Sequence, residues 1–536
     1  MTSTLLHSLR HSAAFRTLTN PVFLAVAAGI MLMLGSFGGG AIRYRGGVLD
    51  ALGLSFLAYG HGQGLSNTVL FIGQILLIGS WVHLGHRLFK GGFDVEKRLE
   101  LVKRTLVALL IPLFFAAPMM SRDVYSYLMQ GAMLRDGFDP YTEGAAVNPG
   151  PMLLEVSHDW RNTTTPYGPL HLWIGNIITT MVGDNVTLGV MAYKVISIAG
   201  LIGIAYGVSG IAKHFGADQA VALWIGVANP VMIIHMIGGM HNESLMVGLV
   251  SCGLLLVLRK KYVLGVALIA IAVSLKATAA IALPFVVWIG MFYFAQRLAN
   301  KKGHTEPTLV QRLIAFVSAG AVGVAITGVV VSAITWMSGA SWGWISEISG
   351  NSKVINPLAF PSLVASVIGL VARIFMDDFN YNAVVDVLRN VSMVLMLLGL
   401  IICWWLFRRT PRRAIAGTAA AYAVAFVFNS VTLPWYYASL FSLVGTFRPP
   451  SWLLRFFAAF SVFIALMFSG SGNHMLYTIV MVIIAMLIAW IATVVIFDDA
   501  KGNTVLTAKP NTVPNSVPNT EPNTALNTVP KQDPTS

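Results

Sequence analysis

Long apolar runs separated by short polar connections fill the chain from residue 21 to residue 498. A helix needs about 20 apolar residues to cross the hydrocarbon core of a bilayer, and many of these runs approach that length. Inside lipid the backbone must satisfy its own polar groups, so such runs predict helices. We therefore expect an all-α, multi-pass membrane domain. The runs predict about fourteen spans, at 21–37, 69–84, 105–120, 188–211, 220–237, 245–258, 262–275, 277–294, 313–336, 391–407, 414–431, 436–447, 453–468 and 475–497.

Lysine and arginine gather in the short connections, which is the pattern of cytoplasmic loops in membrane proteins. The densest basic connection, residues 87–104, precedes the run 105–120, which must then emerge on the outer side. Two apolar stretches, 170–182 and 363–375, would each form a helix of only about 20 Å, short of a hydrocarbon core of about 30 Å. Counting either as a span would also place later basic clusters outside. We predict that both are interfacial helices on the outer surface.

This topology divides the chain into a membrane domain and two cytoplasmic ends. The large outer loops are expected at about 121–187 and 337–389, and the cytoplasmic ends at 1–20 and 499–536. The last segment repeats Pro-Asn-Thr and has little apolar surface to bury, so we expect it to be disordered.

Composition supports a multi-pass membrane protein. Apolar residues make up 56% of the chain and charged residues 11%, against about 25% charged in soluble domains. The net charge of +13 is explained by the basic loops, so it does not indicate a nucleic-acid partner. Cys252 and Cys403 lie inside apolar runs and are interpreted as packing residues. No nucleotide-binding loop or zinc-binding helix is evident, and we expect neither a metal nor a cofactor.

An acidic residue follows directly after the third predicted span. Asp123 stands where a membrane helix gives way to the first outer loop, a position that favours a functional role. Spacing alone is equally consistent with an Asp that caps the next helix. Arg122 beside it is equally defensible as a lipid-headgroup anchor and as a phosphate ligand.

Other polar and aromatic clusters fall on the same predicted side of the membrane. Each also has a simpler explanation, as a turn, an interfacial aromatic anchor or a snorkelling side chain. Lys276 departs from the positive-inside trend, which weakly supports a phosphate ligand. Three consecutive side chains such as His241-Asn242-Glu243 cannot all face one ion on a helix, so this run does not predict a metal site. The candidate substrate-binding residues are Arg122, Tyr125, Tyr127, Asp139, Tyr141, Arg161, Tyr167, His241, Asn242, Glu243, Lys276, Trp435 and Tyr436.

Five motifs carry a resemblance to a known family. They are SRDVYSYLMQGAML from Ser121, GFDPY from Gly137, TPYGPL from Thr165, GGMHNES from Gly238 and LPWYY from Leu433. Together they resemble the actinobacterial polyprenol-phosphomannose-dependent α-(1→6)-mannopyranosyltransferases, the MptB-like branch of the membrane-embedded GT-C glycosyltransferases. The resemblance is clearest between residues 105 and 437.

The resemblance implies a GT-C fold with Asp123 as the catalytic carboxylate. It implies a polyprenyl-phosphomannose donor and a mannosylated phosphatidylinositol or related glycolipid acceptor, in lipomannan and lipoarabinomannan biosynthesis. Related sequences often carry His-Asn-Asp where this chain has Glu243, which leaves the role of that carboxylate open. A phosphate leaving group needs no general acid, so one carboxylate can act alone as the base in an inverting transfer.

Two other functions are compatible with the residues alone. A GT-C enzyme could use another donor, such as polyprenyl-phosphoarabinose, because no residue decides between the two sugars. A glycolipid transporter would show inverted repeats and charges near the middle of the membrane. No repeat is evident, and the polar motifs gather at one predicted face.

Overall fold

The computed structural model describes residues 20–90, 94–350, 355–376 and 378–497. Within these ranges the secondary structure is helical, apart from one isolated bridge between Phe468 and His474. The predicted all-α architecture is therefore confirmed. The predicted cytoplasmic ends, at 1–20 and 499–536, lie outside the described residues except for Asn20.

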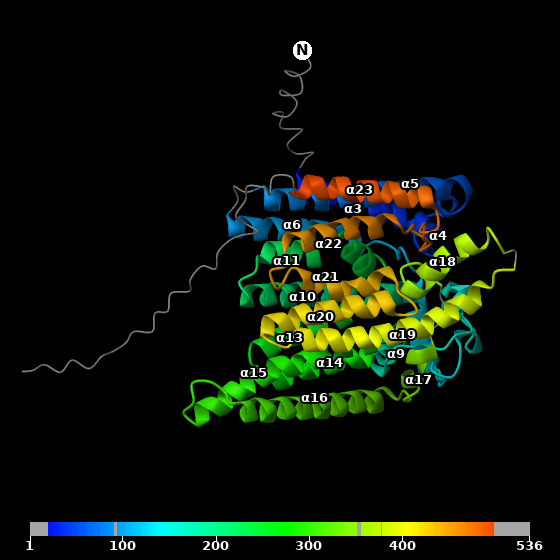
Figure 1. Cartoon of the computed structure of the whole chain (residues 1–536). Coiled ribbons are helices and arrows are strands. Elements are labelled where there is room, and N and C mark those ends of the chain that lie inside the picture. Colours follow the sequence, from blue (N-terminus) through cyan, green and yellow to red (C-terminus); the bar gives the residue numbers. More distant parts are fainter. Residues whose placement is uncertain (1–19, 91–93, 351–354, 377, 498–536) are drawn as a thin grey trace, which may run out of the picture.

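Long helices lie side by side along one common direction (Figure 1). At one edge of the bundle α3 (Pro21–Gly39), α5 (Gly60–Phe89) and α23 (Ile479–Phe497) pack together, and α16 (Leu309–Ser338) forms the opposite edge. Between them lie α6 (Val95–Phe114), α10 (Val186–His214), α11 (Gln219–Gly226), α13 (Glu243–Leu258), α14 (Tyr262–Leu275), α15 (Leu283–Lys301), α19 (Tyr381–Leu406), α20 (Pro411–Phe428), α21 (Ala438–Val444) and α22 (Ser451–Leu466).

By length and apolar composition, 7 of the described helices can cross a membrane. The count becomes 8 if the pair 219–226 and 230–238, bent by 51°, forms one broken span. Four further apolar helices have only 10–17 residues, among them α13, α14 and α22. Every predicted span overlaps a helix, but the total of about fourteen remains a prediction.

The third predicted span differs from the helix that forms there. The run 105–120 was expected to be helical throughout, whereas α6 begins at Val95 and ends at Phe114. The side chain of Asp94 caps its start, so the helix includes the basic residues before the apolar run. Pro112 lies in its last turn, and an irregular segment then leads to α7 (Asp123–Arg135). Asp123 is thus separated from α6 by a loop that can be shaped independently.

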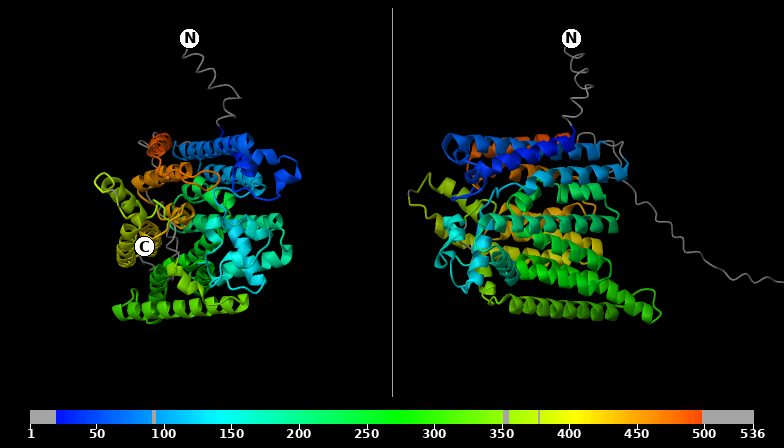
Figure 2. Two further views of the ribbon diagram at one scale, coloured as in Figure 1. Left: turned by 90° about the vertical axis from the view of Figure 1, so that its right-hand side faces the viewer. Right: turned by 180° about the vertical axis from the view of Figure 1, so that it is seen from behind.

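The two short apolar stretches form α9 (Pro169–Val182) and α18 (Phe360–Ala372), at one end of the bundle (Figures 1 and 2). The path of the chain from α9 to α13 indicates where the two ends of α9 lie in the bundle. Helix α10 leads away from this end and the bent pair returns, and His241 then lies 3.3 Å from Asp123. Both ends of α9 therefore lie at the end of the bundle that holds Asp123, and its interfacial position on the outer surface remains a prediction.

Helix α9 packs tightly on α7 through glycines. A methyl group added to Gly131 would lie 2.2 Å from the carbonyl carbon of Gly175. Only glycine at these positions lets the two backbones approach so closely. This contact fixes the outer layer beside the start of α7.

Basic side chains gather at the other end of the bundle. Arg412 and Arg448 donate to backbone carbonyls of the turn at 215–216, and Arg259 bonds Tyr206 nearby on α10. Arg98 pairs with Asp218 directly after this turn. The motif residues around Asp123 and the basic connections, which the sequence assigns to different sides, therefore lie at opposite ends of one bundle.

Candidate active site

Three irregular segments meet where Asp123 enters α7. The Met119 N–H donates to the Gly238 carbonyl at 3.1 Å, and the Met120 N–H donates to the Gly470 carbonyl at 2.7 Å. Met120 adopts a left-handed conformation (φ 63°), which is uncommon for a residue with a side chain. Backbone bonds thus hold the chain just before Asp123 from two distant parts of the sequence.

The Gly238-Gly239 pair explains why the second segment can approach so closely. A methyl group on Gly238 would lie 2.7 Å from the Met119 side chain, and one on Gly239 would lie 2.7 Å from the His241 ring. Met240 between them and His241 is also left-handed, with φ 54°. The glycines leave room for the imidazole to fold back toward Asp123.

The Asp123 carboxylate lies among polar partners and is 16% exposed. Its Oδ2 atom is 3.3 Å from Nδ1 of His241 and 3.5 Å from the hydroxyl of Tyr127, one helical turn along α7. Burial raises the pKa of Asp123, but contacts with His241 and Ser121 and the charge of Lys276 outweigh it and hold the pKa below its ordinary value. The group is therefore an ionised carboxylate that can accept a proton.

A buried ion pair lies behind this carboxylate. The Lys276 ammonium, at the end of α14, bonds the Glu243 carboxylate at the start of α13, and both side chains are under 10% exposed. The ammonium also lies 4.2 Å from the centre of the Tyr436 ring and 5.3 Å from that of Tyr167. Lys276 therefore reaches the site as predicted, but through an ion pair and aromatic faces.

Aromatic rings complete the surroundings of Asp123. Trp435 stacks on His241 with ring centres 3.6 Å apart. Tyr127, Tyr167 and His171 form a second cluster with ring centres 4.5–5.5 Å apart. His171 is a functional candidate that sequence reasoning missed, although it follows the TPYGPL motif directly.

His171 is held between two amides. Its Nε2 atom lies 3.0 Å from Oε1 of Gln130, and Nδ1 lies 3.5 Å from Nδ2 of Asn242. Burial, followed by the charge of Lys276, lowers the pKa of His171 to about 3. The imidazole is therefore neutral and serves to hold Asn242 in place.

A cavity of about 250 Å³ opens above Asp123. Its aromatic lining comes from Trp160, Tyr167, Trp435 and Tyr436, and its polar lining includes Ser471 and Asn473. The last two come from the segment after α22, which was assigned no chemistry from the sequence. The small polar string Ser469-Gly470-Ser471-Gly472-Asn473 between two apolar helices was the available signal. The cavity thus combines aromatic faces with hydroxyl and amide groups, a combination that suits a sugar.

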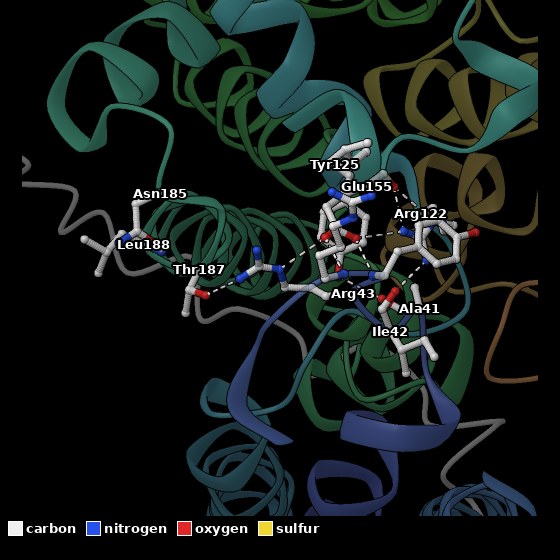
Figure 3. Close-up of polar contacts among 12 residues, drawn as sticks. Ala41, Ile42, Arg43, Arg122, Tyr125, Glu155, Asn185, Thr187 and Leu188 are labelled. Carbon is white, nitrogen blue, oxygen red and sulfur yellow. Dashed lines mark hydrogen bonds and ion pairs between the residues drawn. The ribbon is translucent and has the colours of Figure 1, made fainter. Parts of the chain in front are cut away.

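Arg122 lines the cavity, but its guanidinium group is bonded to Ile42 and Glu155. It donates to the carbonyls of Ile42 (2.6 Å) and Glu155 (2.6 Å), and pairs with the Glu155 carboxylate at 3.3 Å. Figure 3 shows Glu155 between Arg122 and Arg43, with Arg43 also reaching Thr187. Glu155 is 1% exposed and accepts from two backbone N–H groups of the 43–45 segment as well. Arg122 therefore joins the outer loops together.

Four other predicted residues lie outside this cavity lining. Tyr125 donates to the Ala41 carbonyl, and Arg161 donates to the carbonyls of Val156 and Leu154. Asp139 accepts from Ser341 in the second outer loop. Tyr141 packs beside it, close to Gly343. These residues shape the loops, and the structure does not bring them to Asp123.

Within the described ranges, no three His, Cys, Asp or Glu side chains converge in a way that would hold a metal ion. Near Asp123, Lys276 is paired with Glu243, and His171 lies between Gln130 and Asn242.

Comparisons with known proteins give matches to one family along most of the chain. A family described as "Alpha-(1->6)-mannopyranosyltransferase, N-terminal domain" matches residues 22–292, and "MptB C-terminal domain" matches residues 361–498. The chain is 76% identical to alpha-(1->6)-mannopyranosyltransferase A of Corynebacterium glutamicum, over 90% of this chain and 99% of that protein. It is 34% identical to alpha-(1->6)-mannopyranosyltransferase A of Mycobacterium tuberculosis, over 92% and 93%. Alpha-(1->6)-mannopyranosyltransferase B of Corynebacterium glutamicum is 26% identical, over 76% and 69%.

Proposed function

This chain belongs to the alpha-(1->6)-mannopyranosyltransferase family and is a membrane mannosyltransferase, and on that premise we propose its donor, acceptor and catalytic base. The donor is polyprenyl-phosphomannose, and the acceptor is a mannosylated phosphatidylinositol or related glycolipid of the lipomannan and lipoarabinomannan pathway. The architecture is that of a GT-C enzyme with about fourteen spans and a site on the outer face of the plasma membrane. Family membership disfavours the transporter alternative.

In this reaction Asp123 acts as the general base. The acceptor 6-hydroxyl oxygen attacks the anomeric carbon of mannose, while the bond from that carbon to the phosphate oxygen breaks. The electron pair of the broken bond leaves with polyprenyl phosphate, and the hydroxyl proton moves to the Asp123 carboxylate. Because the attack is a direct displacement, a β-linked donor gives an α-linked product.

One observation carries this proposal. Asp123 is an ionised carboxylate at the base of an aromatic and hydroxyl-rich cavity, 3.3 Å from His241 and close to the charge of Lys276. Such a group can accept a proton without a second carboxylate, since phosphate leaves unprotonated. Trp160 and Trp435 offer faces on which sugar rings can stack.

The purified protein in lipid vesicles tests the donor and the linkage together. We expect polyprenyl-phosphomannose to extend a phosphatidylinositol-mannoside acceptor by an α-(1→6)-linked residue, and polyprenyl-phosphoarabinose to give no product. The product linkage is read by NMR and by digestion with a linkage-specific mannosidase. Faster transfer of arabinose, or retention of the β configuration, would contradict the proposed reaction.

The depressed pKa of Asp123 predicts the pH dependence of kcat/KM. A base must be ionised to act, so activity is present above its pKa and falls as pH drops through it. Because this pKa is lowered, the acid limb should lie below the ordinary Asp value of about 3.9. We expect kcat/KM to stay level down to about pH 4.5, with thermal melting at each pH as the control for unfolding. An acid limb near pH 6 would assign the base to another group.

Cysteine labelling tests the proposed orientation. Asp184 is exposed after α9, at the end of the bundle that holds the candidate site, and Lys260 is exposed at the basic end, so both accept a cysteine. In intact cells we expect a membrane-impermeant maleimide to label Asp184→Cys and to label Lys260→Cys only after permeabilisation. The unmodified chain, whose Cys252 and Cys403 lie within helices, gives the background. The reverse pattern would place the site in the cytoplasm.

A further inference from the structure

The His241 imidazole is buried without a satisfied hydrogen bond. It is fully buried, and both ring nitrogens lack a hydrogen-bond partner of good geometry among the described residues. A polar group left in this state costs about 1–3 kcal/mol. Oδ2 of Asp123 lies 3.3 Å from Nδ1. That contact is close enough to become a hydrogen bond after a small movement of the carboxylate.

The ring is packed against Trp435 and the backbone of Gly239. Trp435 stacks on it at 3.6 Å with 16° between the planes. A methyl group at Gly239 would lie 2.7 Å from Cδ2 and 2.8 Å from Nε2 of the ring, so the backbone there is in close contact. Because the imidazole is packed in this way, we expect the movement that closes the bond to come from Asp123.

Asp123 has the freedom to make this movement. Its side chain borders the cavity and is partly exposed, whereas His241 does not line the cavity. The contacts to His241 and to the Tyr127 hydroxyl both fall on Oδ2. Oδ1 makes neither of these two contacts, and Asp123 lines the cavity in which an acceptor hydroxyl would lie.

We propose that His241 is a positioning residue, which donates its Nδ1 proton to Oδ2 of Asp123 when the acceptor fills the cavity and so aims Oδ1 at the acceptor hydroxyl. Hydrogen bonds of this kind are often long in unliganded enzymes and shorten in the reacting complex. The inference rests on the proposed role of Asp123 as base. It changes His241 from a candidate substrate ligand into a group that acts through Asp123.

Two substitutions at one position separate this role from a packing role. An asparagine amide nitrogen can take the place of Nδ1, whereas a glutamine amide nitrogen takes the place of Nε2. We expect His241→Asn to keep kcat within about threefold of the unmodified protein. His241→Gln should lower kcat by about 10- to 100-fold, the loss seen when groups that orient metal ligands are removed. KM for the acceptor should stay nearly constant in both, and His61→Gln, an exposed histidine on α5, should leave kcat unchanged.

Equal losses in His241→Asn and His241→Gln, or a rise in KM without a fall in kcat, would overturn the inference. If either variant is unstable on heating, the double variant Asp123→Asn/His241→Gln decides. A group that acts only through Asp123 adds no further loss to Asp123→Asn, whereas an independent role multiplies the two losses. Full turnover by Asp123→Asn alone would instead reject the proposed base, so the two failures are distinguishable.

Discussion

Asp123→Asn is expected to lower kcat by about 10²–10⁴ while leaving the affinity for donor and acceptor nearly unchanged. Asparagine keeps the size of the side chain and its place at the start of α7, but it cannot accept the hydroxyl proton. Turnover is measured with polyprenyl-phosphomannose and a phosphatidylinositol-mannoside acceptor in vesicles. Donor affinity is measured separately by equilibrium binding.

Asp184→Asn is the matched control for this loss. It removes the same charge at the same end of the bundle, from a side chain 57% exposed that pairs with Arg135 and does not line the cavity. We expect kcat to remain unchanged. If Asp123→Asn retained full turnover, the catalytic assignment would fail. A large rise in KM alone would make Asp123 a substrate ligand.

Lys276→Met is expected to lower the free energy of unfolding by about 3–5 kcal/mol, because it leaves the Glu243 carboxylate buried without its cation. Glu243 is 1% exposed, and its Oε2 atom has no hydrogen-bond partner among the described residues. Methionine fills similar space and removes only the charge. Thermal and denaturant unfolding of the solubilised protein measure the loss.

The double variant Lys276→Met/Glu243→Gln separates stability from substrate binding. With both charges removed, most of the lost stability should return, since an ion pair replaced as a whole often costs little. If stability returns and donor affinity remains normal, Lys276 acts through Glu243 and Asp123. If stability returns while donor affinity falls by about 10-fold or more, Lys276 binds the phosphate directly.

The sequence predicted that distant motifs meet at one end of the bundle. Counting the predicted membrane spans gives the direction of each helix, and so the end at which each motif lies. Once the run 170–182 is kept from spanning, Asp123, His241 and Lys276 must lie at one end, and they do. The number of spans is predicted from long apolar runs and basic clusters, and both can be read directly from the local composition of the sequence. The ends of α6 were less predictable, because a side-chain cap at Asp94 and a late proline decide them.

The partners of individual side chains could not be predicted in this way. Arg122 looked equally suited to a phosphate, and only the fold brings Glu155 and the 42–45 segment against it. Ser471 and Asn473 line the cavity from a segment that a backbone bond from Met120 to Gly470 joins to the start of α7. Contacts between distant loops of this kind leave no periodic signal in the sequence.

The backbone bonds of Met119 and Met120 bear on how the protein can evolve and be engineered. The segment before Asp123 is positioned by the peptide N–H groups of Met119 and Met120, which donate to Gly238 and Gly470, and every residue except proline supplies such a donor. We therefore expect that side chains around the cavity can be exchanged to accommodate a different acceptor while Asp123, the proposed base, keeps its position. Proline at position 119 or 120 would remove one of these N–H donors, so we expect it to disturb the position of Asp123.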